Sequence, residues 1–175
     1  TNTPALFGLA TDEELGADYD GDGDFEPGVS RTDAQGFKQI YILTQSGTTE
    51  QRQWGLNGDV LKTGHFDSDD KADLVAIRSQ LGNLTWYINK STGSSEVFNW
   101  GLPAGVLAAG ESPADVPFIG HFDSDNIHDA LVARTADGII TWFVRGSTAG
   151  ARAGVAFGLL NDKPLPPADI DGNGI

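Results

Sequence analysis

Residues 54–78 read WGLNGDVLKTGHFDSDDKADLVAIR, and most of this pattern occurs again along the chain. The hexamer GHFDSD at 64–69 returns at 120–125, and a related acidic stretch, ADYDGDGD, lies at 17–24. An aromatic-Gly-Leu triplet recurs with it, as FGL at 7–9, WGL at 54–56, WGL at 100–102 and FGL at 157–159. Self-similarity at a fixed period of this length is typical of repeat architectures. The pattern therefore indicates one structural unit that is copied along the chain.

The spacing of the acidic stretches divides the chain into units of similar length. The stretches begin at Asp18, His65, His121 and Asp169, so the intervals between them are 47, 56 and 48 residues. The distance from each acidic stretch to the next triplet is 36, 35 and 36 residues, which places the extra length of the longest interval at 103–117. This segment, PAGVLAAGESPADVP, is rich in Pro, Gly and Ala and is predicted to be a looped insertion.

These units define one repeat domain that covers 1–175. Its predicted parts are a partial repeat at 1–17, repeats at 18–64, 65–120 and 121–168, and a truncated repeat at 169–175. Propellers close with about 4–8 blades, so three whole repeats with two partial ones fall at or below that minimum.

Each whole repeat contains segments of strand-forming composition in the same order. An arginine lies thirteen residues after the first residue of each acidic stretch, as Arg31, Arg78 and Arg134. LTWYINK at 84–90 and IITWFVR at 139–145 come next and are rich in β-branched and aromatic residues. No segment combines helical periodicity with caps. We therefore expect an all-β fold, a β-propeller-like array of four-stranded antiparallel blades, in which radial repetition protects the sheet edges.

Composition excludes several classes of function. The chain has 175 residues, 39% of them hydrophobic, which is enough for a sizeable core. Its 25 acidic and 11 basic residues give a formal charge of -14, so cations are favoured partners and nucleic acid or anionic membranes are not. There is no cysteine, and no apolar run approaches the ~20 residues of a membrane span. The chain starts at Thr1 and has no methionine, which indicates a processed chain or a fragment.

The first acidic stretch has the residue pattern of a calcium-binding turn. Positions 1, 3, 5, 7 and 9 of the loop are all acidic: Asp18, Asp20, Asp22, Asp24 and Glu26. Calcium takes about 6–8 oxygen ligands with flexible geometry, which suits a tight turn that presents carboxylates on alternate residues. An EF-hand would need flanking helices and a glutamate at position 12, where this chain has Val29. We therefore predict a structural Ca2+ site in a loop between two strands.

The other acidic stretches keep part of this ligand set. Positions 3, 5 and 9 are aspartates in the second and third stretches: Asp67, Asp69 and Asp73, then Asp123, Asp125 and Asp129. Position 1 is His65 or His121, and imidazole is a poor ligand for a hard, oxygen-preferring cation. Three interpretations stay open for these loops: a Ca2+ site, a turn that the histidine stabilises by internal hydrogen bonds without an ion, or a transition-metal site of histidine and aspartates. The fourth stretch offers Asp169, Asp171 and Asn173 at positions 1, 3 and 5.

With these motifs, the chain resembles the FG-GAP/VCBS repeats of bacterial secreted and surface proteins, which are related to the calcium-binding blades of integrin α-chain propellers. The resemblance rests on the quoted stretch at 54–78 and on ADYDGDGDFEPGVSR at 17–31, and it covers nearly the whole chain. It implies β-propeller blades, Ca2+ in the loops, and an extracellular or cell-surface setting. The chain departs from the family pattern at position 1 of two loops, at Asp70 and Asn126 where the family prefers glycine, and at Glu26, which replaces an aspartate.

We expect a non-catalytic, calcium-stabilised extracellular module that serves adhesion, surface-structure assembly or partner binding. Its expected partners are a protein or glycan at a cell surface, or further copies of the chain joined through blade edges. The alternatives are an accessory domain of a secreted enzyme and a lectin-like propeller, with Trp86, Trp142 or Tyr87 as an exposed stacking surface. If the chain is the non-catalytic module, the repeated aromatics pack between neighbouring sheets instead. His128 aligns with Ala72 and is interpreted as a surface substitution, not as a general base.

Overall fold

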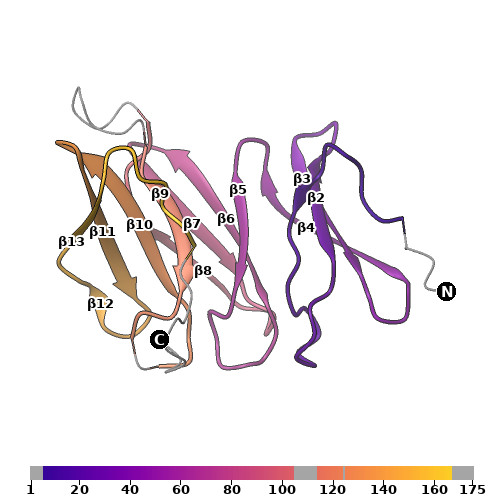
Figure 1. The fold of residues 1–175 in the computed structure, drawn as a ribbon. Coiled ribbons are helices and arrows are strands. Elements are labelled where there is room, and N and C mark those ends of the chain that lie inside the picture. The colour runs from indigo at the N-terminus through magenta and orange to yellow at the C-terminus, as the bar shows by residue number, and fades with distance from the viewer. Residues whose placement is uncertain (1–5, 105–113, 124, 167–175) are drawn as a thin grey trace.

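The computed structural model describes residues 6–104, 114–123 and 125–166, and its regular elements are β-strands. The strands form three antiparallel sheets that follow one another along the chain, so that each sheet is completed before the next begins (Figure 1). The expected all-β class is thus confirmed. Within the described ranges, the structure contains no helix with the length and apolar character needed to cross a membrane.

Each sheet is an antiparallel meander of four or five strands. Sheet 1 contains β1 (Glu13–Glu14), β2 (Gly28–Thr32), β3 (Phe37–Leu43) and β4 (Thr49–Leu56). Sheet 2 contains β5 (Val60–Gly64), β6 (Asp73–Gln80), β7 (Asn83–Asn89) and β8 (Ser95–Asn99). Sheet 3 contains β9 (Val116–Gly120), β10 (Asp129–Ala136), β11 (Ile139–Gly146), β12 (Gly150–Ala151) and β13 (Val155–Leu159). Strands are hydrogen-bonded in chain order, except that β12 and β13 both pair with β11.

The sheets are offset from the sequence repeats by one strand. β5 precedes the second acidic stretch but pairs with β6, which follows it, and β9 pairs with β10 in the same way. Each acidic stretch therefore joins the first and second strands of one sheet. Of the expected insertion at 103–117, residues 105–113 lie outside the described residues and 116–117 begin β9. The truncated repeat at 169–175 also lies outside them.

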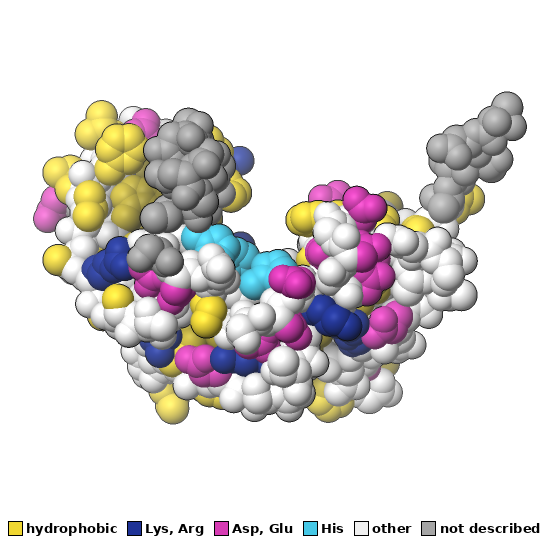
Figure 2. Space-filling model, turned by 90° about the horizontal axis from the view of Figure 1, so that it is seen from below, with side chains coloured by type: hydrophobic (Ala, Val, Ile, Leu, Met, Phe, Trp, Pro, Cys, Tyr) yellow, Lys and Arg dark blue, Asp and Glu magenta, His cyan; other side chains and the backbone are white. Residues whose placement is uncertain are grey.

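The three sheets form an arc around a hollow, and apolar side chains fill the space between neighbouring sheets (Figure 2). Successive residues of a strand point to opposite faces of its sheet. In β6, Leu74 belongs to the cluster shared with sheet 1, whereas Val75 and Ile77 belong to the cluster shared with sheet 3. Because sheet 2 is covered on both faces, its second strand is a nearly continuous apolar run.

We call the face of a sheet that lies toward the next sheet in the chain its forward face, and the opposite face its rear face. The forward face of sheet 2 is covered by sheet 3, and its largest side chain, Trp86, is fully buried. The forward face of sheet 3 carries a third apolar cluster, composed of Phe118, Leu131, Ala133 and Ile140 with Phe122, Trp142 and Val144 packed against it. Among the described residues, no fourth sheet covers this cluster.

Two hairpin turns place non-glycine residues in left-handed backbone conformations. The turn between β6 and β7 has φ of 50° at Leu81 and 77° at Gly82, and the turn between β10 and β11 has 51° at Asp137 and 78° at Gly138. Positive φ at both residues is typical of type I′ turns, which favour Asn-Gly or Asp-Gly. A leucine in this conformation is strained by about 1–2 kcal/mol. The side chain of Leu81 is exposed, so packing does not offset this strain.

We expect Leu81→Asn to raise the free energy of unfolding by about 1 kcal/mol, because asparagine tolerates the left-handed region. Urea unfolding of the two chains measures the difference. Asp137→Asn at the matched turn is the control and should change the free energy by less than about 0.5 kcal/mol. A destabilised Leu81→Asn variant would show that the leucine makes a contact that its exposure does not suggest.

Candidate metal centres

Each acidic loop brings three carboxylates together between the first and second strands of a sheet. In each group, one side-chain oxygen per residue lies within 4.8 Å of the others. The groups are Asp18, Asp20 and Asp22; Asp67, Asp69 and Asp73; and Asp123, Asp125 and Asp129. These nine residues meet as their spacing predicts. Asp24 and Glu26 do not belong to the first group, and Asp169, Asp171 and Asn173 lie outside the described residues.

The acid at position 9 ties each loop to its sheet. Asp73 is buried, and its two oxygens accept hydrogen bonds from the backbone N–H groups of Phe66 at 2.6 Å and Ser91 at 2.8 Å. Asp129 accepts the equivalent pair of bonds in sheet 3. Burial raises the pKa of Asp73, and the nearby Asp67 and Asp69 charges act in the same direction. A bound cation would offset both effects, because it supplies an opposite charge beside a desolvated carboxylate.

Glu26 occupies the same place in the first loop but has a different role. It is buried and accepts a hydrogen bond from the backbone N–H of Tyr19 at 2.8 Å, as Asp73 does from Phe66. Glu26 therefore anchors the loop without joining the carboxylate group. Asp18, at the position that His65 and His121 occupy in the second and third loops, completes the group in its place.

Within each loop, the aspartates at positions 3 and 5 form hydrogen bonds with the backbone two residues further on. Oδ1 of Asp67 accepts from the N–H of Asp69 at 3.2 Å, and Oδ1 of Asp69 accepts from Lys71 at 3.0 Å. Asp123 and Asp125 repeat these bonds at 3.2 and 3.0 Å. Such turns are a common use of aspartate. They hold alternate side chains on the same side of the loop, which explains how the carboxylates meet.

Hydroxyl groups from a hairpin turn of the same sheet support the carboxylates, and sequence reasoning missed them. Ser91 donates to Asp69 at 2.5 Å and Thr92 donates to Asp67 at 2.7 Å. In sheet 3, Asp125 accepts from Ser147 at 2.6 Å and from Thr148 at 2.9 Å. The hydrogen bond from Ser147 is the main reason that the pKa of Asp125 is lowered to about 2. The signal was a Ser-Thr pair that begins 26 residues after His65 and again 26 residues after His121.

The third loop contains a carboxylate oxygen without a hydrogen bond. Oδ2 of Asp123 is buried and has no hydrogen-bond partner, because Thr148 donates to Asp125 whereas its counterpart Thr92 donates to Asp67. The guanidinium of Arg152 lies 3.6 Å away. Burial raises the pKa of Asp123, and the charges of Asp129 and Asp125 add to this effect. This group thus has an oxygen available to a cation.

The histidines at position 1 do not join the carboxylate groups of the described residues. The rings of His65 and His121 instead contact His128, with ring centres 5.3 and 4.3 Å apart. Nδ1 of His128 accepts a hydrogen bond from the backbone N–H of His65 at 2.8 Å. The interpretation of His128 as a surface substitution is therefore wrong: the ring is half-buried between sheets 2 and 3. Burial, with His121 and His65 nearby, lowers its pKa to about 4, so it is neutral at pH 7.

The repeated arginines form a connection between sheets that the sequence did not predict. Arg78 of sheet 2 donates two hydrogen bonds of 2.8 Å to Asp59, which also accepts from the backbone N–H of Leu56 at 2.7 Å. Leu56 ends the WGL triplet at the end of sheet 1. The same connection joins Leu102, Asp115 and Arg134 between sheets 2 and 3. We call this set of contacts the Leu-Asp-Arg connection. Its role is structural.

The tryptophans of the WGL triplets also link neighbouring sheets. The indole N–H of Trp54 donates to the backbone carbonyl of Tyr87 at 3.1 Å, and that of Trp100 donates to Phe143 at 3.2 Å. Packing between sheets, as expected for these aromatics, is therefore confirmed for both. Trp86 is fully buried and cannot stack on a sugar.

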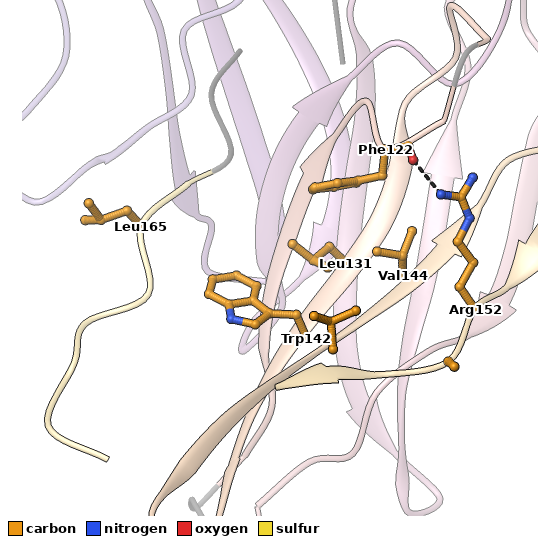
Figure 3. Close-up of a pocket in the computed structure, with 8 residues that line it drawn as sticks. Phe122, Leu131, Trp142, Val144, Arg152 and Leu165 are labelled. Atoms are coloured by element: carbon orange, nitrogen blue, oxygen red, sulfur yellow. Dashed lines mark hydrogen bonds between the residues drawn. The ribbon is translucent and has the colours of Figure 1, made fainter. Parts of the chain in front are cut away.

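An apolar cavity of about 370 Å³ lies on the forward face of sheet 3 (Figure 3). Phe122, Leu131, Trp142 and Val144 lie on one side of it, and Leu165 approaches from the segment that follows β13. Arg152 is the one charged residue that the described part of the chain contributes to the lining, and its guanidinium donates to the carbonyl of Phe122 at 2.7 Å. Among the described residues, the lining includes no carboxylate, histidine or nucleophile.

Figure 2 shows acidic side chains on the same face of the molecule as the histidines, around the hollow of the arc. Comparison of the chain with protein-family models, with curated proteins and with solved structures found no match. The site is therefore interpreted from its own geometry.

Proposed function

We propose that the chain is a non-catalytic, cation-stabilised repeat module in which the three sheets are blades of a β-propeller-like array and the acidic loops hold Ca2+. One observation carries this proposal: a group of three carboxylates occurs in the same connection of all three sheets. A merely solvated acidic loop has no reason to bring its charges together three times. The cation has a structural role, because each loop fixes the first strand of a sheet to its second.

The donor chemistry favours calcium over other cations. All the donors in the three groups are carboxylate oxygens, and the hydroxyls of Ser91 and Ser147 beside two of them are oxygen ligands as well. Zinc, copper and nickel prefer imidazole or thiolate, and the histidines lie apart from the groups. Three carboxylates whose oxygens lie within 4.8 Å repel one another until a cation binds between them. Extracellular calcium modules bind with dissociation constants of about 10⁻⁴–10⁻³ M, so sites with only a few carboxylates can be filled outside the cell.

The arrangement of the sheets supports the propeller assignment. The strands of each sheet pair in chain order, apart from β13, which pairs with β11, and the three sheets lie in an arc. An extracellular setting and a role in adhesion or surface assembly agree with the FG-GAP/VCBS resemblance and with the acidic surface. A lectin-like module is the second candidate, because Trp142 is half-exposed in the cavity of sheet 3. Binding to a glycan array that Trp142→Ala abolishes would favour it.

We expect Ca2+ to raise the melting temperature and magnesium to raise it far less. A ligand in hundredfold excess over its dissociation constant stabilises the folded state by about 2.7 kcal/mol per site. For a chain of this size, that is a shift of about 5–10 °C per site. Differential scanning calorimetry in Ca2+ and in chelator measures the shift, and isothermal titration should find three sites per chain.

The double variant Asp67→Asn/Asp69→Asn tests whether the loops are the sites. It should bind two Ca2+ ions per chain and lose the part of the Ca2+-induced rise in melting temperature that this loop contributes. Asp70→Asn is the matched control, since Asp70 lies in the same loop but is exposed and outside the carboxylate group. A melting temperature that Ca2+ does not change, or a loss that Asp70→Asn shares, would contradict the proposal.

A further inference from the structure

The contact between sheets 1 and 2 is repeated almost unchanged between sheets 2 and 3. In both, the triplet that ends one sheet lies on the rear face of the next, with Gly55 against Ala76 and Gly101 against Val132. Both contacts include the Leu-Asp-Arg connection and a bond from the triplet tryptophan to a backbone carbonyl. The contact is therefore a defined interface with two halves. We call the end of the preceding sheet its donor half and the rear face of the next sheet its acceptor half, whatever the direction of the hydrogen bonds between them.

The end of sheet 3 carries a donor half that no sheet receives within the described residues. The triplet FGL at 157–159 ends β13, and Asp162 accepts a hydrogen bond from the N–H of Leu159 at 2.8 Å, as Asp59 does from Leu56. The described residues offer Asp162 no arginine. Phe157 and Leu159 are 77% and 65% exposed, and no further sheet within the described residues packs on the apolar forward face of sheet 3 beside them.

Sheet 1 carries an acceptor half on which no sheet of the described residues packs. Arg31 lies over the ring of Tyr41 at 4.6 Å, as Arg78 lies over Tyr87 at 4.8 Å. Phe25 occupies the loop position at which sheet 2 has the buried Ala72, but Phe25 is 78% exposed. The rear face of sheet 1 therefore presents an aromatic side chain where the other sheets meet a preceding sheet.

The N-terminal segment holds part of this acceptor half. The triplet FGL at 7–9 lies on sheet 1 with Gly8 against Val29, and Asp12 forms a 2.6 Å ion pair with Arg31. Asp12 also accepts from the N–H of Leu9 at 2.8 Å. The segments 7–12 and 157–162 thus share the triplet, the aspartate three residues after its leucine, and the hydrogen bond between them. Both fit the same arginine.

We propose that two copies of the chain assemble head to tail, with the end of sheet 3 of each copy, including 157–162, packed on the rear face of sheet 1 of the other in place of 7–12. The inference rests on the proposed blade arrangement and names the partner that completes it. Asp162 meets Arg31 of the other copy, so the contact is complementary in charge as well as in apolar surface. Two copies supply six sheets, which is within the range of about 4–8 at which propellers close. The interface is heterologous, and closure at two copies prevents a filament.

Sedimentation equilibrium in Ca2+ measures the dissociation constant of the dimer and so tests the proposed assembly. Two matched substitutions should change this constant in opposite directions. Asp162→Ala removes the incoming aspartate and should weaken the dimer at least about tenfold. Asp12→Ala weakens the segment that occupies the acceptor and should tighten the dimer by a similar factor. Phe157→Ser removes an exposed side chain, so it should fold normally and also weaken the dimer.

A monomer in all four chains at hundreds of micromolar would overturn the proposal, as would a dimer that none of the substitutions affects. Masses above that of a dimer would overturn closure at two copies. Melting temperatures in Ca2+ and in chelator, measured on the same samples, separate this proposal from the previous one. A monomer that Ca2+ still stabilises refutes only the assembly, and a dimer that Ca2+ does not stabilise refutes only the calcium sites.

Discussion

Replacement of Trp86 by alanine is expected to lower the free energy of unfolding by about 3–5 kcal/mol. Trp86 is fully buried between sheets 2 and 3 and stacks on Phe98, with ring centres 5.8 Å apart. Its indole N–H donates to the backbone carbonyl of Trp100 at 2.8 Å. The substitution removes the largest buried side chain of the interface, leaves a cavity between two sheets, and leaves a buried carbonyl without its partner.

Trp142 provides a matched control for this measurement. It occupies the same repeat position on sheet 3, and its indole N–H donates to the carbonyl of Phe157 at 2.7 Å. Its ring, however, is only half-buried and lies on the forward face of sheet 3 beside the cavity, where no further sheet of the described residues packs on it. In denaturant titrations at low micromolar concentration, Trp142→Ala should cost less than half as much as Trp86→Ala. Equal losses would mean that another surface covers the forward face of sheet 3 even at that concentration.

The second large effect is expected from Asp59→Ala, which should destabilise the chain by about 3–5 kcal/mol. The Asp59 side chain is 1% exposed and accepts hydrogen bonds from Arg78 and from the N–H of Leu56. Without it, the guanidinium and a backbone N–H lose their partner in a mostly buried place. In the native chain, the hydrogen bonds that Arg78 donates to Asp59 raise the pKa of Arg78. In the variant the arginine still keeps its charge, because a guanidinium is not deprotonated in proteins, so it cannot avoid the penalty by losing its proton.

Asp162→Ala is the control for the second effect, because Asp162 accepts the same backbone bond but is exposed. It should cost less than about 1 kcal/mol. Asp59→Asn separates the two functions of the acid, since the amide oxygen can still accept the backbone bond while the charge is lost. Urea unfolding of the three variants gives the values. A cost for Asp59→Ala no greater than that for Asp162→Ala would show that the Leu-Asp-Arg connection contributes little.

The features that the sequence predicted are those that depend on local spacing. Carboxylates on alternate residues of a short turn meet because each forms a hydrogen bond with the backbone two residues on, as Asp67 and Asp69 do. The all-β class followed from β-branched and aromatic segments of strand length, such as the one that contains Trp86. Both depend on a few consecutive residues, so no tertiary information was required.

The features that the sequence did not predict depend on contacts between distant segments. Ser91 supports Asp69 across 22 residues, and Arg78 meets Asp59 across 19 residues. Neither pairing follows from residue type, because exposed serine and arginine are common on any surface. His128 was misinterpreted for the same reason: its alignment with Ala72 gave no sign that the neighbouring sheet would bring His65 beside it. Glu26 was assigned as a ligand on its position alone; its oxygens lie outside the group of Asp18, Asp20 and Asp22, and it accepts a hydrogen bond from the backbone N–H of Tyr19.

The Leu-Asp-Arg connection also bears on how such a chain grows during evolution. Each unit carries an arginine that receives the preceding unit and a triplet with an aspartate that enters the following one. An internal duplication of a gene segment that encodes one unit would therefore add a sheet that already fits both of its neighbours. Deletion of one whole unit would likewise leave two neighbouring units that can form the Leu-Asp-Arg connection with each other. Descendants of this chain could therefore differ in their number of sheets without a new kind of interface between sheets.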